Sequence, residues 1–138
     1  MAKTVTPAMI QTPGWAGTAY TTASSTATHV TGGAEGTKVV SLTAVSNSTS
    51  AHVFQVGMST GGAAFPIGSV SIAASAGSDG STPAVDMFSP GLIPGLPVDN
   101  DGVPYVMVPS TSHSLVLTAA AAINTGKQVT FTSIYGSF

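Results

Sequence analysis

The sequence contains no cysteine and no arginine, and three lysines and five acidic residues are its only charged side chains. Without cysteine the chain can form neither disulfides nor thiolate metal sites, so its stability must come from packing or from association. The formal net charge is −2, and no cluster of lysines offers the positive surface that neutralises phosphates. We therefore expect no nucleic-acid partner.

Long apolar runs are also missing. No stretch approaches the roughly 18 uninterrupted apolar residues that a membrane-spanning helix needs, so we expect no membrane partner. A secretion signal has a continuous apolar stretch after its charged start, but Pro7, Pro13 and Gly14 interrupt the N-terminal region of this chain. We therefore predict synthesis and assembly in a cytoplasm. Since 43% of the 138 residues are hydrophobic, we expect a folded chain of one domain.

Residues 1–36 are rich in Thr, Ser, Ala and Gly and show no sustained hydrophobic period. This composition predicts an extended N-terminal arm. Its short apolar groups centre on Ile10, Trp15 and Tyr20, and aromatic residues commonly anchor contacts between proteins. We predict that these three residues contact a partner. The alternative is a disordered tail, which the polar composition favours.

From residue 37 onward the sequence alternates apolar and polar residues in short runs, which is typical of half-buried strands. Val40, Leu42 and Ala44 are predicted to face the core, and a polar turn at residues 47–50 predicts a hairpin with the next strand. Further strands are expected at residues 51–59, 65–74, 103–108, 114–119 and 128–135. With many Gly and Pro turns and no long helix, residues 37–138 are predicted to form an all-β antiparallel β-sandwich of jelly-roll-like form.

The stretch DMFSPGLIPGLPVDNDGVPYVMVP, residues 86–109, contains five prolines. A connection of roughly two dozen residues is far longer than usual in a compact domain, and prolines stiffen it. Its apolar side chains have two interpretations. They grip a partner, or they fold over an open end of the sandwich and fill the core. The candidate partner contacts in this loop are Met87, Phe88, Leu92, Ile93 and Leu96.

Little in the sequence indicates chemistry. His29, His52 and His113 lie far apart without the spacing of a metal site, and no nucleophile elbow accompanies the many serines. Asp99 and Asp101 in DNDG fit turns that begin the following strand better than a cation site, although the cation alternative stays open. We therefore expect no enzyme, no catalytic or metal-binding residues and no cofactor.

Several phrases resemble small virion proteins of tailed bacteriophages. They are KVVSLTAVSNSTSAHVFQVGMS, GSVSIAASAGSDGSTPAVDMF, GLPVDNDGVPYVMVP and TGKQVTFTSIYGSF, which together span about residues 38–138. The resemblance implies a capsid decoration, or cement, protein on the virion surface, with the major capsid protein as partner and a homo-oligomer, often a trimer. Two alternatives are kept: a minor tail or fibre protein, and a surface glycan-binding module.

Overall fold

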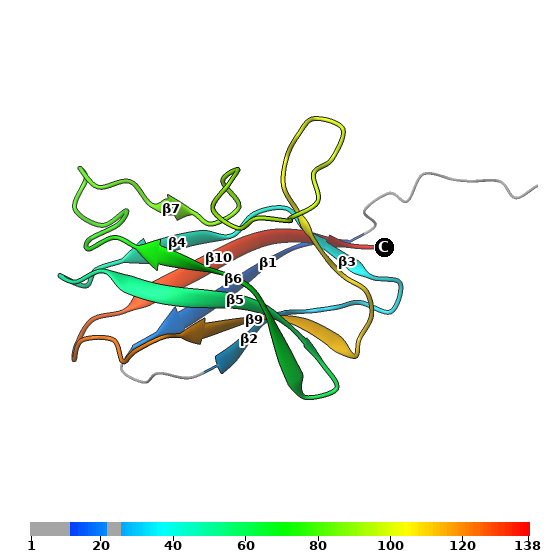
Figure 1. Cartoon of the computed structure of the whole chain (residues 1–138), viewed down its shortest axis with the longest axis horizontal. Coiled ribbons are helices and arrows are strands. Elements are labelled where there is room, and N and C mark those ends of the chain that lie inside the picture. The colour runs from blue at the N-terminus through cyan, green and yellow to red at the C-terminus, as the bar shows by residue number, and fades with distance from the viewer. Residues whose placement is uncertain (1–11, 22–25) are drawn as a thin grey trace, which may run out of the picture.

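The computed structural model describes residues 12–21 and 26–138, which form two antiparallel sheets packed as a sandwich (Figure 1). The predicted all-β sandwich is confirmed. Within the described residues every regular element is a strand, and none is a helix long and apolar enough to cross a membrane.

The first sheet is built around the C-terminal strand, β10. The strand β1 pairs with β10 along its whole length, from Thr12 opposite Ser137 to Tyr20 opposite Val129. Two short strands, β4 and β3, pair with β10 one after the other along its length. The strand β7 pairs with β4, and β8 pairs with β3. The strands of this sheet are β1 (Thr12–Tyr20), β3 (Thr37–Val39), β4 (Thr43–Ser46), β7 (Val85–Asp86), β8 (Val106–Val108) and β10 (Val129–Ser137).

The second sheet has the order β2-β9-β5-β6. Its strands are β2 (Thr26–Thr31), β5 (His52–Thr60), β6 (Ala63–Ile72) and β9 (His113–Ala119). Gly61 and Gly62 join β5 to β6 with positive φ angles of 58° and 92°, as a two-residue hairpin turn requires. The tip of this hairpin projects from the body of the sandwich in Figure 1.

The hairpin predicted around residues 47–50 is wrong, because β4 and β5 belong to different sheets. The connecting residues cross from one sheet to the other instead of turning back. The buried Ser48 lies in this crossing, and its hydroxyl oxygen is 2.8 Å from His52 Nε2 and 3.3 Å from Asn124 Nδ2. A polar turn between two alternating segments is compatible with a hairpin within one sheet and with a crossing between two sheets. The sequence pattern therefore could not distinguish these two connections.

The strand predicted from residue 37 is interrupted between β3 and β4. Val39 is fully buried and Val40 is only partly buried, so the prediction for Val40 is wrong, whereas Leu42 and Ala44 face the core as predicted. At the interruption the backbone N–H of Ile134 donates to the hydroxyl of Ser41 at 2.9 Å. The Ser41 side chain accepts the hydrogen bond that a backbone carbonyl would accept in a regular pair of strands. This irregularity shifts the alternation of inward and outward side chains.

Residues 12–20 and 26–31 lie within the predicted N-terminal arm, yet they form β1 and β2 of the two sheets. The inward side of β1 carries Gly14, Ala16 and Thr18, which are too small to show as hydrophobic alternation. Ile10 lies outside the described residues, and the division of the chain at residue 36 stays a prediction.

Three aromatic rings join the two sheets at the core. Tyr20, Phe54 and Phe131 contact one another edge to face, with centroid separations of 4.6, 5.0 and 5.9 Å. The Tyr20 hydroxyl donates to the carbonyl of Leu117 and accepts the N–H of Ala27 at 3.1 Å. The ring thus supplies apolar packing, while its hydroxyl satisfies polar groups of the opposite sheet.

Gly32 has no room for a side chain, and this gives a test of the fold. A Cβ there would lie 2.1 Å from the carbonyl oxygen of Ser110, a backbone atom. We expect Gly32→Ala to lower the free energy of unfolding by about 1–3 kcal/mol in urea denaturation. Gly17→Ala is the control, since its nearest neighbour is 3.9 Å away, and should stay within about 0.5 kcal/mol. Equal effects would contradict the close approach at Gly32.

Candidate binding surface

The structure divides the predicted contact residues into buried and exposed groups. Tyr20, Met87, Phe88 and Ile93 lie in the hydrophobic core, whereas Trp15 is 72% exposed and Leu92 is 44% exposed. Leu96 is partly buried against the core. In the folded chain, the hypothesis of direct partner contact therefore applies to Trp15, Leu92 and Leu96.

The proline-rich loop, residues 87–105, is anchored in the sandwich at its beginning. The Met87 N–H donates to the Leu42 carbonyl at 2.8 Å, and Phe88 N–H donates to Asp86 Oδ1 at 3.0 Å. Further on, Ile93 packs so closely on β6 that a Cβ at Gly68 would be 3.1 Å from its side chain. Burial of Met87, Phe88 and Ile93 matches the core-filling interpretation of the loop.

The end of the loop is a small ordered turn built on Asp99. Its Oδ1 accepts the N–H groups of Asp101 and Val103, both at 2.9 Å, and these bonds hold the pKa of Asp99 below its usual value. Val98 and Pro104 form a bridge beneath the turn. This is the Asx turn that the DNDG sequence favours. In Figure 1 the turn projects beyond the sheets.

Two hollows lie beside the proline-rich loop and share Pro90, Gly102 and Pro104 as lining. The larger, about 400 Å³, lies between the loop and the first sheet and is called here the sheet hollow. The smaller, about 290 Å³, lies within the loop. The remaining lining residues of the sheet hollow are Val40, Ser41, Thr43, Asp86, Phe88 and Val103.

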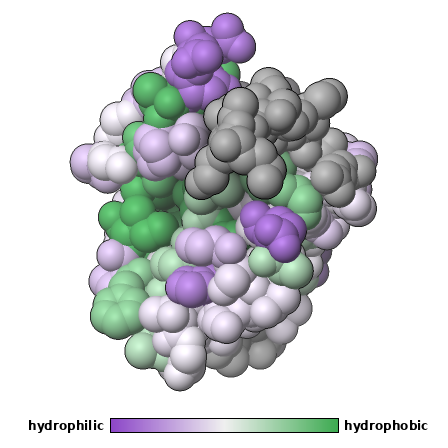
Figure 2. Space-filling model, turned by 90° about the vertical axis from the view of Figure 1, so that its right-hand side faces the viewer, coloured by the Kyte–Doolittle hydropathy of each residue, from purple (hydrophilic) through white to green (hydrophobic). Residues whose placement is uncertain are grey.

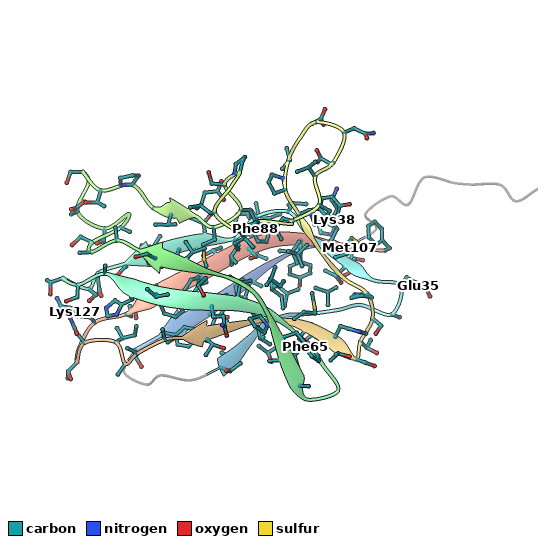
Figure 3. All side chains as sticks on the ribbon, in the orientation of Figure 1. Glu35, Lys38, Phe65, Phe88, Met107 and Lys127 are labelled. Carbon is teal, nitrogen blue, oxygen red and sulfur yellow. The ribbon has the colours of Figure 1, made fainter. Side chains whose placement is uncertain are left out.

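The outer face of the first sheet continues from the sheet hollow to the exposed strand β1. Trp15 lies directly opposite Ile134 on β10, and both side chains are exposed. Lys38 pairs with Met107 at one end of this face, and its Nζ lies 4.6 Å from the ring centroid of Tyr105 (Figure 3). Figure 2 looks at the right-hand end of the molecule in Figure 1 and shows hydrophobic residues beneath a hydrophilic tip at that end.

The three histidines serve the fold. Among the described residues no three His, Cys, Asp or Glu side chains lie together in a way that could hold a metal ion. Ser133 and Ser48 are fully buried, so their hydroxyls cannot meet a substrate. Each histidine lies 2.8 Å from a serine hydroxyl: His29 with Ser133, His52 with Ser48 and His113 with Ser110.

Sequence reasoning did not single out several exposed apolar side chains. Val98 and Val103 flank the DNDG turn, and apolar residues beside a polar turn in a long loop are a usable signal. Ile134 is out of phase with Phe131 and the other inward residues of β10, which marks it as outward. Phe65 lies on β6 of the β5–β6 hairpin and is 58% exposed (Figure 3). No pattern in the sequence distinguishes it from a core residue.

No family model matches the sequence, and neither does any curated protein. Among solved structures, a chain of the acidic stable capsid structure of Helicobacter pylori bacteriophage KHP30 has a similar fold, with a TM-score of 0.55. The two chains are 13% identical, and the alignment covers 93% of this chain and 90% of that one. This likeness shows a shared fold across nearly the full length of both chains.

The anchoring of the loop can be tested with neighbouring residues. Ile93→Ala removes a buried side chain packed on β6, and we expect it to lower the free energy of unfolding by about 2–4 kcal/mol. The adjacent Leu92→Ala removes an exposed side chain and should change it by less than about 1 kcal/mol. Urea denaturation measures both. A loss for Leu92→Ala as large as for Ile93→Ala would contradict the anchoring.

The burial of His29 predicts a pH-dependent stability. Its ring nitrogens lie 2.8 Å from the hydroxyls of Thr18 and Ser133, and burial lowers its pKa from 6.5 to about 4. Between these values the unfolded chain binds the proton more strongly than the folded chain. Stability is therefore full above pH 6.5 and is lost as the pH falls to about 4, by up to about 3 kcal/mol.

Urea denaturation at a series of pH values checks this expectation. The carboxylates also titrate in acid, so the informative quantity is the difference between the wild type and His29→Gln, which has no titrating ring. This difference should change between pH 6.5 and about 4. Parallel pH profiles for the two proteins would show that His29 does not titrate with a lowered pKa.

Proposed function

We propose that this chain is a non-enzymatic virion structural protein that binds a bacteriophage capsid shell and stabilises it as a decoration protein. The observation that carries the proposal is the shared fold with a chain of a phage capsid structure, aligned over 93% of this chain. The phrases between residues 38 and 138 that resemble small phage virion proteins support it independently.

The surface suits a protein that binds beside many identical neighbours. Few charges on the chain mean little like-charge repulsion between adjacent copies, and small Ser, Thr and Ala side chains lose little entropy on contact. The exposed apolar residues supply binding free energy, since each large apolar side chain that becomes buried contributes about 1.5–3 kcal/mol. The major capsid protein is the partner that we propose for them.

The residues proposed to meet the shell lie on the loop side of the molecule. Val98 is exposed on the projecting turn, and Leu92 is exposed on the preceding part of the loop. The same loop is anchored through Ile93, so these side chains are held in position before binding. A surface ordered in advance loses less entropy when it binds than a flexible one.

Reconstitution tests this function. Purified chain is added to shells assembled without it from the major capsid protein encoded in the same genome. We expect saturable binding with many copies per shell and a higher temperature of shell disruption, because a ligand that binds only the intact shell stabilises it. Sedimentation of the shells and differential scanning calorimetry measure the two effects.

The matched variants are Val98→Ser in the loop and Val53→Ser in the second sheet, both at exposed positions. We expect the first to weaken shell binding and the second to leave it unchanged. Absence of binding by the wild type would refute the proposal. A few copies per virion, instead of many, would favour the alternative of a minor tail or fibre protein.

A further inference from the structure

Trp15 is the only tryptophan of the chain, and it is 72% exposed. It lies on β1 and projects from the outer face of the first sheet, as does Ile134 opposite it, because Ser133 and the residues in phase with it point inward. Tryptophan is, with tyrosine and arginine, one of the side chains enriched among the residues that dominate the binding energy of protein interfaces. An exposed one held on a regular strand is therefore a strong candidate for a contact.

The sheet hollow on the same face matches an indole ring in chemistry. Pro90, Val103 and Pro104 provide apolar walls, and a volume of about 400 Å³ is ample for one aromatic side chain. Indole has a single N–H donor and needs an acceptor when buried. Asp86 lines the hollow with a carboxylate, which has acceptor positions beyond the one used by the Phe88 N–H.

Within one copy, Trp15 and the hollow lie on opposite sides of β10. Trp15 is opposite Ile134 on β10, and Ile134 is hydrogen-bonded on its other side to Ser41, which lines the hollow. Trp15 and the hollow are thus separated by one intervening strand, or about 10 Å between the outer strands. Ile134 lies between them, and Trp15 is not among the residues that line the hollow of its own copy, so we look to a second copy for the ring that fills it.

A two-fold axis parallel to β10 and above it satisfies both contacts together. Rotation about this axis places Trp15 of each copy over the hollow of the other and brings the two Ile134 side chains together at the centre. We propose that two copies of this chain pack through the outer faces of their first sheets, with Trp15 of each seated in the sheet hollow of the other. The contact is reciprocal and does not depend on binding to a shell.

The absence of like charge at the centre of this face favours the arrangement. Gly17, Thr132 and Thr43 form the next row across the sheet, beside Trp15 and Ile134, and all three are uncharged. Among the described residues, Lys38 at one end of this face and Asp86 at the hollow carry charges of opposite sign. Two copies can therefore approach without placing like charges in contact at the axis.

Sedimentation equilibrium and fluorescence of the lone tryptophan test the proposal on the full chain. We expect a monomer–dimer equilibrium, and the emission of Trp15 should move to shorter wavelength as dimer forms and the indole leaves water. Trp15→Ala should raise the dimer dissociation constant by at least about 30-fold, the effect of losing a hot-spot residue. Val103→Lys should weaken the dimer while leaving the tryptophan in place.

Phe65→Ala is the matched control, because it removes an exposed aromatic ring from the second sheet. Its dissociation constant should stay within about twofold of the wild type. Circular dichroism of each variant verifies that the fold is retained. A wild type that stays monomeric at every concentration, a trimer, or undiminished association of Trp15→Ala would each overturn the proposal.

Crosslinking tests the register of the contact, because the chain has no native cysteine. In the proposed dimer, residue 17 of one copy faces residue 43 of the other across about 10 Å, the separation of packed sheets. A mixture of Gly17→Cys and Thr43→Cys with a short bis-maleimide should give the mixed dimer in excess. Replacing Thr43→Cys by Val53→Cys should abolish this product, and equal yields from both mixtures would overturn the register.

These measurements use no capsid, so their failure is distinguishable from failure of the proposed function. If shells bind the chain but the chain does not self-associate, the two-fold contact is refuted and shell binding stands. If Trp15→Ala loses shell binding while wild type is monomeric, Trp15 contacts the shell, and the self-contact is again refuted.

Discussion

The position of β10 between β1 and the broken strand β3–β4 is the constraint on which the rest of the structure depends. Its inward side carries Val129, Phe131 and Ser133, which meet the second sheet, and its outward side carries Ile134. Pairing with β1 places Trp15 beside Ile134, and pairing on the other edge brings Ser41 and the sheet hollow to the same face. One strand thus determines both the core and the proposed contact surface.

The core must hold two sheets together without disulfides, in a chain with only three lysines and five acidic residues, so it relies on shape and on satisfied polar groups. Tyr20 packs on Phe54 and Phe131, and its hydroxyl bonds the opposite sheet. His29 bridges the sheets in a similar way, since Thr18 and Ser133 lie on the first sheet and His29 on the second. Every buried side-chain nitrogen or oxygen among the described residues has a hydrogen-bond partner.

The sequence predicts those parts of the fold in which alternation follows one period without interruption. Phe54 and Val56 on β5, Val70 and Ile72 on β6, and Leu115 and Leu117 on β9 all face the core as their spacing predicts. Prediction from the sequence fails where small residues form the buried side of a strand, as at Gly14 and Ala16 of β1. Packing at such residues depends on how closely the strand approaches a neighbour. A Cβ at Gly14 would lie 2.5 Å from the Tyr135 ring, and this contact is set by the fold.

The proline-rich loop shows the same limit for the binding surface. Composition alone identifies an apolar, stiff connection, but it cannot distinguish Ile93, which is buried, from Leu92, which is exposed beside it. That difference depends on where the chain crosses Gly68 of β6, a contact between residues far apart in sequence. The sequence does single out Trp15 as a contact residue, but only the fold shows the hollow that lies on the other side of β10 from it.

The weak charge of the chain connects its fold to its proposed role. An isolated protein with exposed Trp15, Val98 and Phe65 and a net charge of −2 has little electrostatic protection against association. On a shell this becomes an advantage, because neighbouring copies are held at high effective concentration and weak contacts suffice to join them. Contacts of modest strength, each formed by one or two apolar side chains, can then act together over the whole surface, which removes the need for a large interface in any single pair.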